Sequence, residues 1–253
     1  VEGDGEEILI PAMVKNAFGI SLDEIGIGLI NIGSVSFEYI ASIFSNERLH
    51  RHCAILTDLD SIVEGSTKCS EEAAKRGTTR KDKLDSLYGE NPWVDSFYAP
   101  YTLEVDFVNE TKNRKYVENV VRNHYSKQTT IDKHIKNIND SFVNRYDSVL
   151  TVAKDMGKGW YATVLSSMLD NNLVIPDYIL KALVFSSQQV LTESILRKIG
   201  IYVLDMYDED ETISELKNKF NTEDINEVIK EFADKLPDDL VTKFFKSRMP
   251  SSA

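Results

Sequence analysis

The chain has 253 residues, of which 42% are hydrophobic and 28% charged, and its formal net charge is −12. This composition is typical of a soluble globular protein that buries a core in one large or two small domains. No apolar run approaches the ~20 residues that a bilayer-spanning helix needs, and no signal-peptide pattern opens the chain, so we expect no membrane association. The negative charge argues against general nucleic-acid binding, although a local basic face can still bind phosphate.

The cysteine content and the first residue lead to two further expectations. Cys53 and Cys69 are the only cysteines and do not make a disulfide framework. Cys53 lies inside an apolar run, which favours a buried thiol in a reducing, cytoplasmic environment. The chain begins with Val1, at the expected end of a strand, and we therefore expect it to be a piece of a longer polypeptide.

The first part of the chain predicts strands that alternate with helices. The expected elements are a helix at 5–18 that stops at Gly19, a strand at 27–32, a helix at 37–44, a strand at 53–57 and a strand at 102–108. Such alternation predicts an α/β fold with a parallel sheet flanked by helices on both faces. The polar stretch 61–95 predicts a long mobile loop with at most a short helix.

The rest of the chain predicts helices without strand signals. These helical stretches are 109–150, 158–169, 177–204 and 211–247. Pro237 is expected to open the last helix.

Two short acidic clusters stand where apolar strands should end. Glu2 and Glu6 flank a glycine-rich turn, and Asp58 and Asp60 follow the strand predicted at 53–57. Ligands of parallel sheets bind beyond the carboxyl ends of the strands, so we expect these carboxylates to share one sheet edge without an obvious cationic partner. Carboxylates are the protein ligands that Mg²⁺ prefers, and two such ions ~4 Å apart can hydrolyse a phosphodiester.

Each cluster also has an ordinary structural interpretation. A glycine-rich turn followed by Glu is common at a strand-to-helix connection, and Asp at strand ends is common in turns. Either cluster alone is therefore weak. The two together, on the first and third strands of one α/β unit, favour a metal site.

The clusters carry a resemblance to a known family. Val1-Glu2-Gly3 with Glu6, followed by Asp58-Leu59-Asp60, resembles the TOPRIM domain of topoisomerases, primases and OLD (overcoming lysogenisation defect) nucleases. Further stretches are most similar to the OLD branch: Asn31–Ser34, Thr102–Asp106 and Gly157–Ala162. The resemblance covers about residues 1–182. It implies a TOPRIM-like fold and a nuclease domain that normally follows an N-terminal ABC-type ATPase.

The resemblance also implies roles for individual residues. Those that match its metal-binding acids are Glu2, Glu6, Asp58, Asp60 and Glu104, which would hold two Mg²⁺ or Mn²⁺ ions. Lys158 matches a lysine that stabilises the charged phosphate, and Glu2 and Lys158 are the expected catalytic residues. The implied domains are a TOPRIM catalytic domain at 1–108 plus about 151–182, a helical insertion at 109–150 and a helical C-terminal extension at 183–253.

A basic stretch offers a possible DNA-binding surface. Its candidate residues are Lys112, Arg114, Lys115, Arg122 and Lys127, and the expected loop at 66–83 would help to hold the duplex. A solvated helix face explains such a run more often than DNA binding does.

The function expected on these grounds is a metal-dependent DNA endonuclease domain from a larger ATPase–nuclease, acting in phage defence or DNA repair. Two alternatives remain: a Mg²⁺-binding interaction module that cuts nothing, and another TOPRIM enzyme of the topoisomerase or primase type. The helical 183–253 part could support a homo-oligomer.

Overall fold

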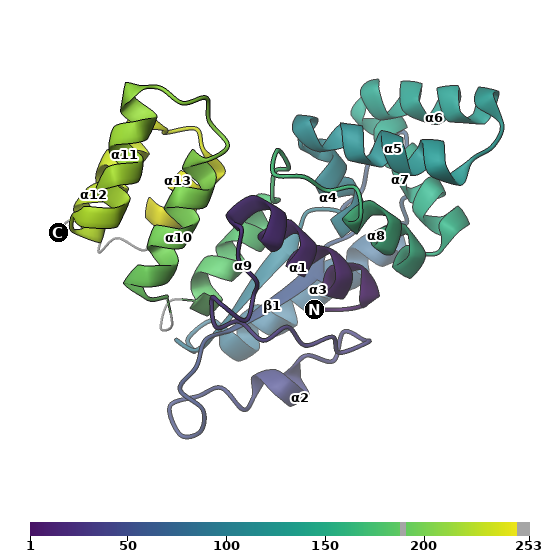
Figure 1. Cartoon of the computed structure of the whole chain (residues 1–253). Coiled ribbons are helices and arrows are strands. Elements are labelled where there is room, and N and C mark those ends of the chain that lie inside the picture. The colour runs from purple at the N-terminus through teal and green to yellow at the C-terminus, as the bar shows by residue number, and fades with distance from the viewer. Residues whose placement is uncertain (188–190, 247–253) are drawn as a thin grey trace.

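A computed structural model describes residues 1–187 and 191–246, and its two strands form one parallel sheet (Figure 1). β1 (Cys53–Asp58) pairs with β2 (Val94–Ala99), and the register runs from Cys53 opposite Val94 to Asp58 opposite Ala99. Helices make up most of the remaining structure. Their bounds are α1 Asp4–Phe18, α2 Glu38–Ala41, α3 Glu71–Tyr88, α4 Leu103–Asn109, α5 Arg114–His124, α6 Gln128–Asn139, α7 Phe142–Met156, α8 Lys158–Ser166, α9 Asp177–Ser187, α10 Glu193–Leu204, α11 Glu211–Thr222, α12 Ile225–Lys235 and α13 Leu240–Lys246, with a 3₁₀ turn at Thr111–Asn113.

Helix α1 and strand β1 confirm the predictions made for them. α1 ends at Gly19, whose φ of 71° suits glycine and whose N–H donates to the carbonyl of Lys15. Met13 and Phe18 lie in the main core, and α1 packs against α8. The first helix therefore runs from the Glu2 turn into the centre of the molecule.

Three other predictions are wrong. Residues 27–32 form no regular strand, although Val1 donates to the Ile30 carbonyl (2.9 Å) and Ile32 donates to the Val1 carbonyl (3.1 Å). The stretch 102–108 is mainly helix α4, and its residues from Leu103 to Val108 are all buried. Because a helix that is buried on every side shows no amphipathic period, its sequence imitates a strand.

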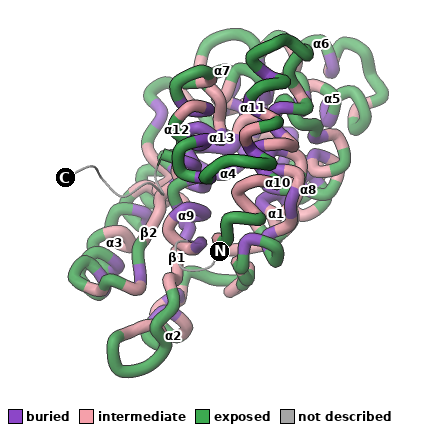
Figure 2. Tube along the Cα trace, turned by 60° about the vertical axis from the view of Figure 1, so that its left-hand side comes forward, coloured by how far each residue is buried: buried purple, intermediate pink, exposed green. Residues whose placement is uncertain are grey.

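The third error concerns 61–95, which is not a loop but contains the long helix α3 and the strand β2. Ser70 caps the start of α3, since its hydroxyl accepts a hydrogen bond from the Ala73 N–H. Its sequence is polar because only Gly77, Leu84 and Tyr88 are buried. The helix predicted at 37–44 is shorter than expected and is limited to α2, in a largely exposed segment (Figure 2).

The C-terminal part is helical, as predicted. α9 packs on both strands and lies largely buried against β1 in Figure 2. α10 to α13 form a group beside it, to the left in Figure 1. The expected helices at 177–204 and 211–247 include residues 188–190 and 247, which lie outside the described part. The predicted domain limits stay predictions, although α7 runs through residue 150 and α9 through residue 182. Within the described ranges, no helix is both long and apolar enough to cross a membrane.

Candidate metal centre

Glu2 is held at the carboxyl end of β1. Its Oε1 accepts a hydrogen bond from the Asp58 N–H at 3.1 Å and another from the Thr57 hydroxyl. The Glu2 turn and the end of β1 are therefore in direct contact, as the sequence predicted for the two acidic clusters. Thr57 is itself buried, so this contact is partly shielded from water.

The chain turns sharply between the two aspartates. Leu59 donates to the Ala99 carbonyl (2.9 Å), which continues the pairing with β2, and Asp60 then donates to the Tyr101 carbonyl (3.1 Å). Asp60 has a φ of 52°, in the left-handed region that Asp tolerates better than most residues. The extended geometry of β1 ends at Asp58, and Leu59 is half-buried.

Glu104 and Lys158 come together from the first turns of two helices. The Lys158 Nζ lies 3.4 Å from Glu104 Oε1, and the carboxylate side chain is only 5% exposed. Glu104 thus reaches the site from helix α4 and not from the predicted strand. The negative charge of Glu104 is the main cause that raises the pKa of Lys158, so the lysine remains an ammonium at neutral pH.

Glu104 and acids of the first cluster raise the pKa values of Asp58 and Glu6. Burial raises the pKa of Asp58 well above its usual value, and the negative charges of Glu104, Glu6 and Glu2 raise it further. Burial likewise raises the pKa of Glu6, with Glu104 and Glu2 adding to the effect. Burial raises the pKa of Asp60, against the opposing positive charge of Arg80. Carboxylates that hinder one another's ionisation form an anionic group.

The expectation that these carboxylates have no obvious cationic partner is wrong. Lys158 contacts Glu104, and Arg80 from α3 lies 3.4 Å from Glu2. Arg80 was not predicted as a site residue, because α3 was expected to be a loop. A helix prediction at 71–88 would have placed Arg80 on the same face as Gly77 and Leu84.

The oxygen atoms of these carboxylates are suitable ligands for a hard divalent cation. Oxygen donors of this kind suit Mg²⁺ or Mn²⁺, and Glu104 Oε2 is a buried oxygen without a hydrogen-bond partner in the described structure. As the side chains stand, no three His, Cys, Asp or Glu residues in the described ranges are close enough to chelate one ion. Binding would therefore require the carboxylates to draw together.

Further polar groups surround the acids and were not predicted. Tyr161 and Tyr178 place hydroxyl groups in the interior that make no hydrogen bond within the described chain. Burial raises the pKa of both phenols, and nearby acids, Glu104 for Tyr161 and Asp58 for Tyr178, add to this effect. Asp106, next to Glu104 on α4, is also buried. Asp106 and Tyr161 lie inside the Thr102–Asp106 and Gly157–Ala162 stretches, which were the only sequence signal for them, whereas Tyr178 lies outside both.

The predicted basic residues lie on or beside α5, which packs against α4 and α8. Lys112 and Lys127 are exposed, whereas Arg114 is half-buried. Arg122 pairs with Glu118 at 3.8 Å.

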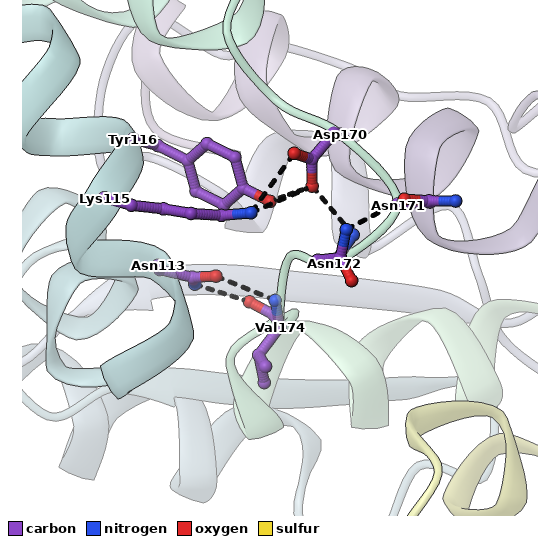
Figure 3. A network of polar contacts seen from close by, with 7 residues as sticks. All are labelled: Asn113, Lys115, Tyr116, Asp170, Asn171, Asn172 and Val174. Atoms are coloured by element: carbon purple, nitrogen blue, oxygen red, sulfur yellow. Dashed lines mark hydrogen bonds and ion pairs between the residues drawn. The ribbon is translucent and has the colours of Figure 1, made fainter. Parts of the chain in front are cut away.

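Lys115 belongs to a structural network (Figure 3). Its Nζ lies 3.1 Å from Asp170, which also accepts from Tyr116 and from the Asn172 N–H. Beside them, Asn113 exchanges two hydrogen bonds with the Val174 backbone. Lys115 therefore helps to fix the 170–174 turn.

Residues 1–60 match the family model described as "Overcoming lysogenization defect protein-like, TOPRIM domain". No curated protein matches the chain. The C-terminal region of the Burkholderia pseudomallei OLD protein is similar in structure, with a TM-score of 0.56 and 23% identity over 75% of this chain and 96% of that chain. The same region of the Xanthomonas campestris pv. campestris OLD protein, phased with mercury, has a TM-score of 0.52 and 24% identity over 75% of this chain and 93% of that chain. Residues 1–60 are therefore similar to the OLD-like TOPRIM domain, and the chain has the mostly helical α/β fold of the C-terminal region of OLD proteins.

Proposed function

We propose that the chain is a Mg²⁺- or Mn²⁺-dependent DNA endonuclease domain that hydrolyses phosphodiester bonds. The observation that carries this proposal is the convergence of acids from both clusters with Glu104 and Lys158 at the end of β1. Buried acids that raise one another's pKa are more stable when a cation joins them. The match of residues 1–60 to the OLD-like TOPRIM family supports the same reading.

The residues divide into two roles. Those that would hold two metal ions are Glu2, Glu6, Asp58, Asp60 and Glu104. The ions would supply Lewis acidity and activation of the attacking water. Lys158 places a permanent positive charge where negative charge develops on the phosphate. Glu2, fixed through one oxygen by Thr57 and Asp58, can orient its second oxygen toward the reacting groups.

The DNA would approach across the basic residues near α5. Lys112, Arg114 and Lys127 are free of ion pairs within the described residues, so they are the better candidates for phosphate contacts. Lys115 and Arg122 would first have to leave Asp170 and Glu118. The part of segment 66–83 that begins at Glu71 lies in helix α3, so it would act as a helix and not as a mobile loop.

The intact protein would place this domain behind an ABC-type ATPase and would act in the cytoplasm, in phage defence or DNA repair. The similarity to C-terminal regions of OLD proteins supports a larger polypeptide. We also propose the divisions 1–108 plus 151–182, 109–150 and 183–253, the last of which could support a homo-oligomer.

One observation favours a module that binds Mg²⁺ without cutting DNA. Arg80 and Lys158 already neutralise two of the carboxylates, so the site is partly balanced without an ion. A topoisomerase or primase reaction is a further alternative within the TOPRIM family. It would show as strand passage or primer synthesis instead of permanent nicking.

A plasmid-nicking assay with Mg²⁺ or Mn²⁺ tests the proposal. We expect nicking by the wild type that EDTA abolishes and that Asp58→Ala and Glu6→Ala remove. Glu64→Ala, which changes an exposed acid outside this group of carboxylates, should cut normally. Equal cutting by all three variants would reject the site, and Mn²⁺ binding without cutting would favour the non-catalytic module.

A further inference from the structure

Helix α3 brings one basic residue, Arg80, to the acids at the end of β1. Its Nη2 lies 3.4 Å from Glu2 Oε1 and donates a hydrogen bond to the main-chain carbonyl of Asp58. The Arg80 side chain is 13% exposed and that of Glu2 is 23% exposed. A pair at this depth is screened by salt far less than a surface pair.

The backbone holds Arg80 in this place. Gly77, one turn earlier, approaches β1 so closely that a Cβ there would lie 2.1 Å from the Leu59 carbonyl oxygen. Leu84, one turn later on the same face, is buried in a core cluster. α3 is therefore packed on both sides of Arg80, against the aspartate turn at Gly77 and in the core cluster at Leu84.

The contacts of Glu2 all use one oxygen. The Thr57 hydroxyl, the Asp58 N–H and the Arg80 guanidinium each meet Oε1. None of these contacts uses Oε2. Arg80 thus helps to orient the carboxylate while leaving its second oxygen for another ligand.

We propose that Arg80 is the positioning residue and internal counter-cation of this centre, which keeps Glu2 in place without metal and weakens the binding of the divalent ion by its charge. The inference rests on the proposed metal function and concerns the regulation of that same site. A fixed positive charge beside the carboxylates repels an incoming cation. The site would then stay assembled at low metal concentration and fill only when the ion is abundant.

The test uses Arg80→Gln, Arg80→Lys and the matched control Arg76→Gln in the 253-residue chain. Arg76 lies one turn earlier on α3, is exposed and pairs with Glu72 instead of Glu2. Mn²⁺ affinity is measured by calorimetry, and the melting temperature is measured in EDTA. We expect Arg80→Gln to bind Mn²⁺ roughly tenfold more tightly than the wild type and to melt about 5 °C lower without metal. Arg80→Lys should stay near the wild type in affinity, and Arg76→Gln should match it in both measurements.

A double-mutant cycle with Glu2→Gln in EDTA separates this inference from the proposed function. If Arg80 positions Glu2, the changes in melting temperature of the two single variants do not add in the double variant. Additive changes would overturn the positioning role, and an unchanged or weaker Mn²⁺ affinity of Arg80→Gln would overturn the counter-cation role. A wild type that binds no Mn²⁺ would reject the proposed function and the effect of Arg80 on metal binding, while the cycle still decides the contact with Glu2.

Discussion

The ammonium group of Lys158 lies 3.4 Å from the buried carboxylate of Glu104, and the two residues stand in the first turns of α8 and α4. The start of a helix favours an acid more than a lysine, because the free backbone N–H groups there carry a partial positive charge. The contact therefore depends on the pairing of the charges. The contact links Lys158, which we propose to contact the phosphate, with Glu104, which we propose to bind the metal.

Replacing Lys158 tests that link. We expect Lys158→Met to lower the nicking rate by about a hundredfold or more, since one electrostatic donor to a developing charge contributes on this scale. Metal-free Lys158→Met should also melt below the wild type, because Glu104 then stays buried without its partner. Lys158→Arg should recover part of the rate. An unchanged rate in Lys158→Met would remove the lysine from the mechanism.

Asp58→Asn should separate stability from activity. Asp58 is crowded by burial and by the charges of Glu104 and Glu6, which raise its pKa. Loss of its charge should therefore raise the melting temperature in EDTA while Mn²⁺ binding and nicking fall below detection. The control is Asp82→Asn, an exposed acid on α3 whose loss should change neither. A lower melting temperature in Asp58→Asn would contradict the argument that the Asp58 charge destabilises the metal-free protein.

Asp106 should make metal-free stability depend on pH. Burial raises its pKa to about 7, with a further contribution from Glu104, against an opposing hydrogen bond from the Tyr101 N–H. The unfolded carboxyl has a pKa of about 4, so the folded state binds more protons between these values. Stability therefore falls as pH rises from about 4 to 7 and then levels off.

We expect Asp106→Asn to reduce this fall, since an amide keeps the acceptor for Tyr101 but does not ionise. Melting temperatures in EDTA between pH 4.5 and 8 measure it. Some decline should remain, because Glu6, Asp58 and Asp60 also have raised pKa values. An unchanged profile in Asp106→Asn would assign the decline to those three acids alone.

Gly77 should be intolerant of any side chain. A Cβ would lie 2.1 Å from the Leu59 carbonyl oxygen, a backbone atom that cannot move without shifting the aspartate turn. We expect Gly77→Ala to lower the melting temperature by several degrees and to reduce nicking, because overpacking costs about 1–3 kcal/mol. Gly28→Ala is the control, since no atom lies within 4 Å of its added Cβ. Wild-type behaviour of Gly77→Ala would show that α3 does not fix the turn.

The local sequence pattern was sufficient to predict an element that buries one face and is bounded by residues that mark its end. Helix α1 shows apolar spacing and stops at Gly19, and β1 is a short apolar run between polar neighbours. The second acidic cluster was identified for the same reason, because Asp58 and Asp60 follow a recognisable apolar run, whereas Glu2 and Glu6 were identified from their glycine-rich turn. The resemblance added Glu104 and Lys158, which spacing alone did not single out.

The local sequence pattern led to wrong predictions for helices that are buried on every side or that bury very few residues. α4 is buried all round, so its alternating residues imitate a strand, whereas α3 buries so few residues that it resembles a loop. The sheet partner β2 was missed inside the same polar stretch. In each case the decisive contacts come from residues distant in sequence, which no local period records.

The sequence by itself determined the acids, their order along the chain and the first helix and strand, because these depend on local apolar spacing and turn residues. Only the tertiary structure decided that α3 carries Arg80 to Glu2 and that two helix starts bring Lys158 to Glu104. These contacts join distant segments, and packing of the helices against β1 sets their distances. The charge balance of the candidate site is therefore a property of the fold and not of any one motif.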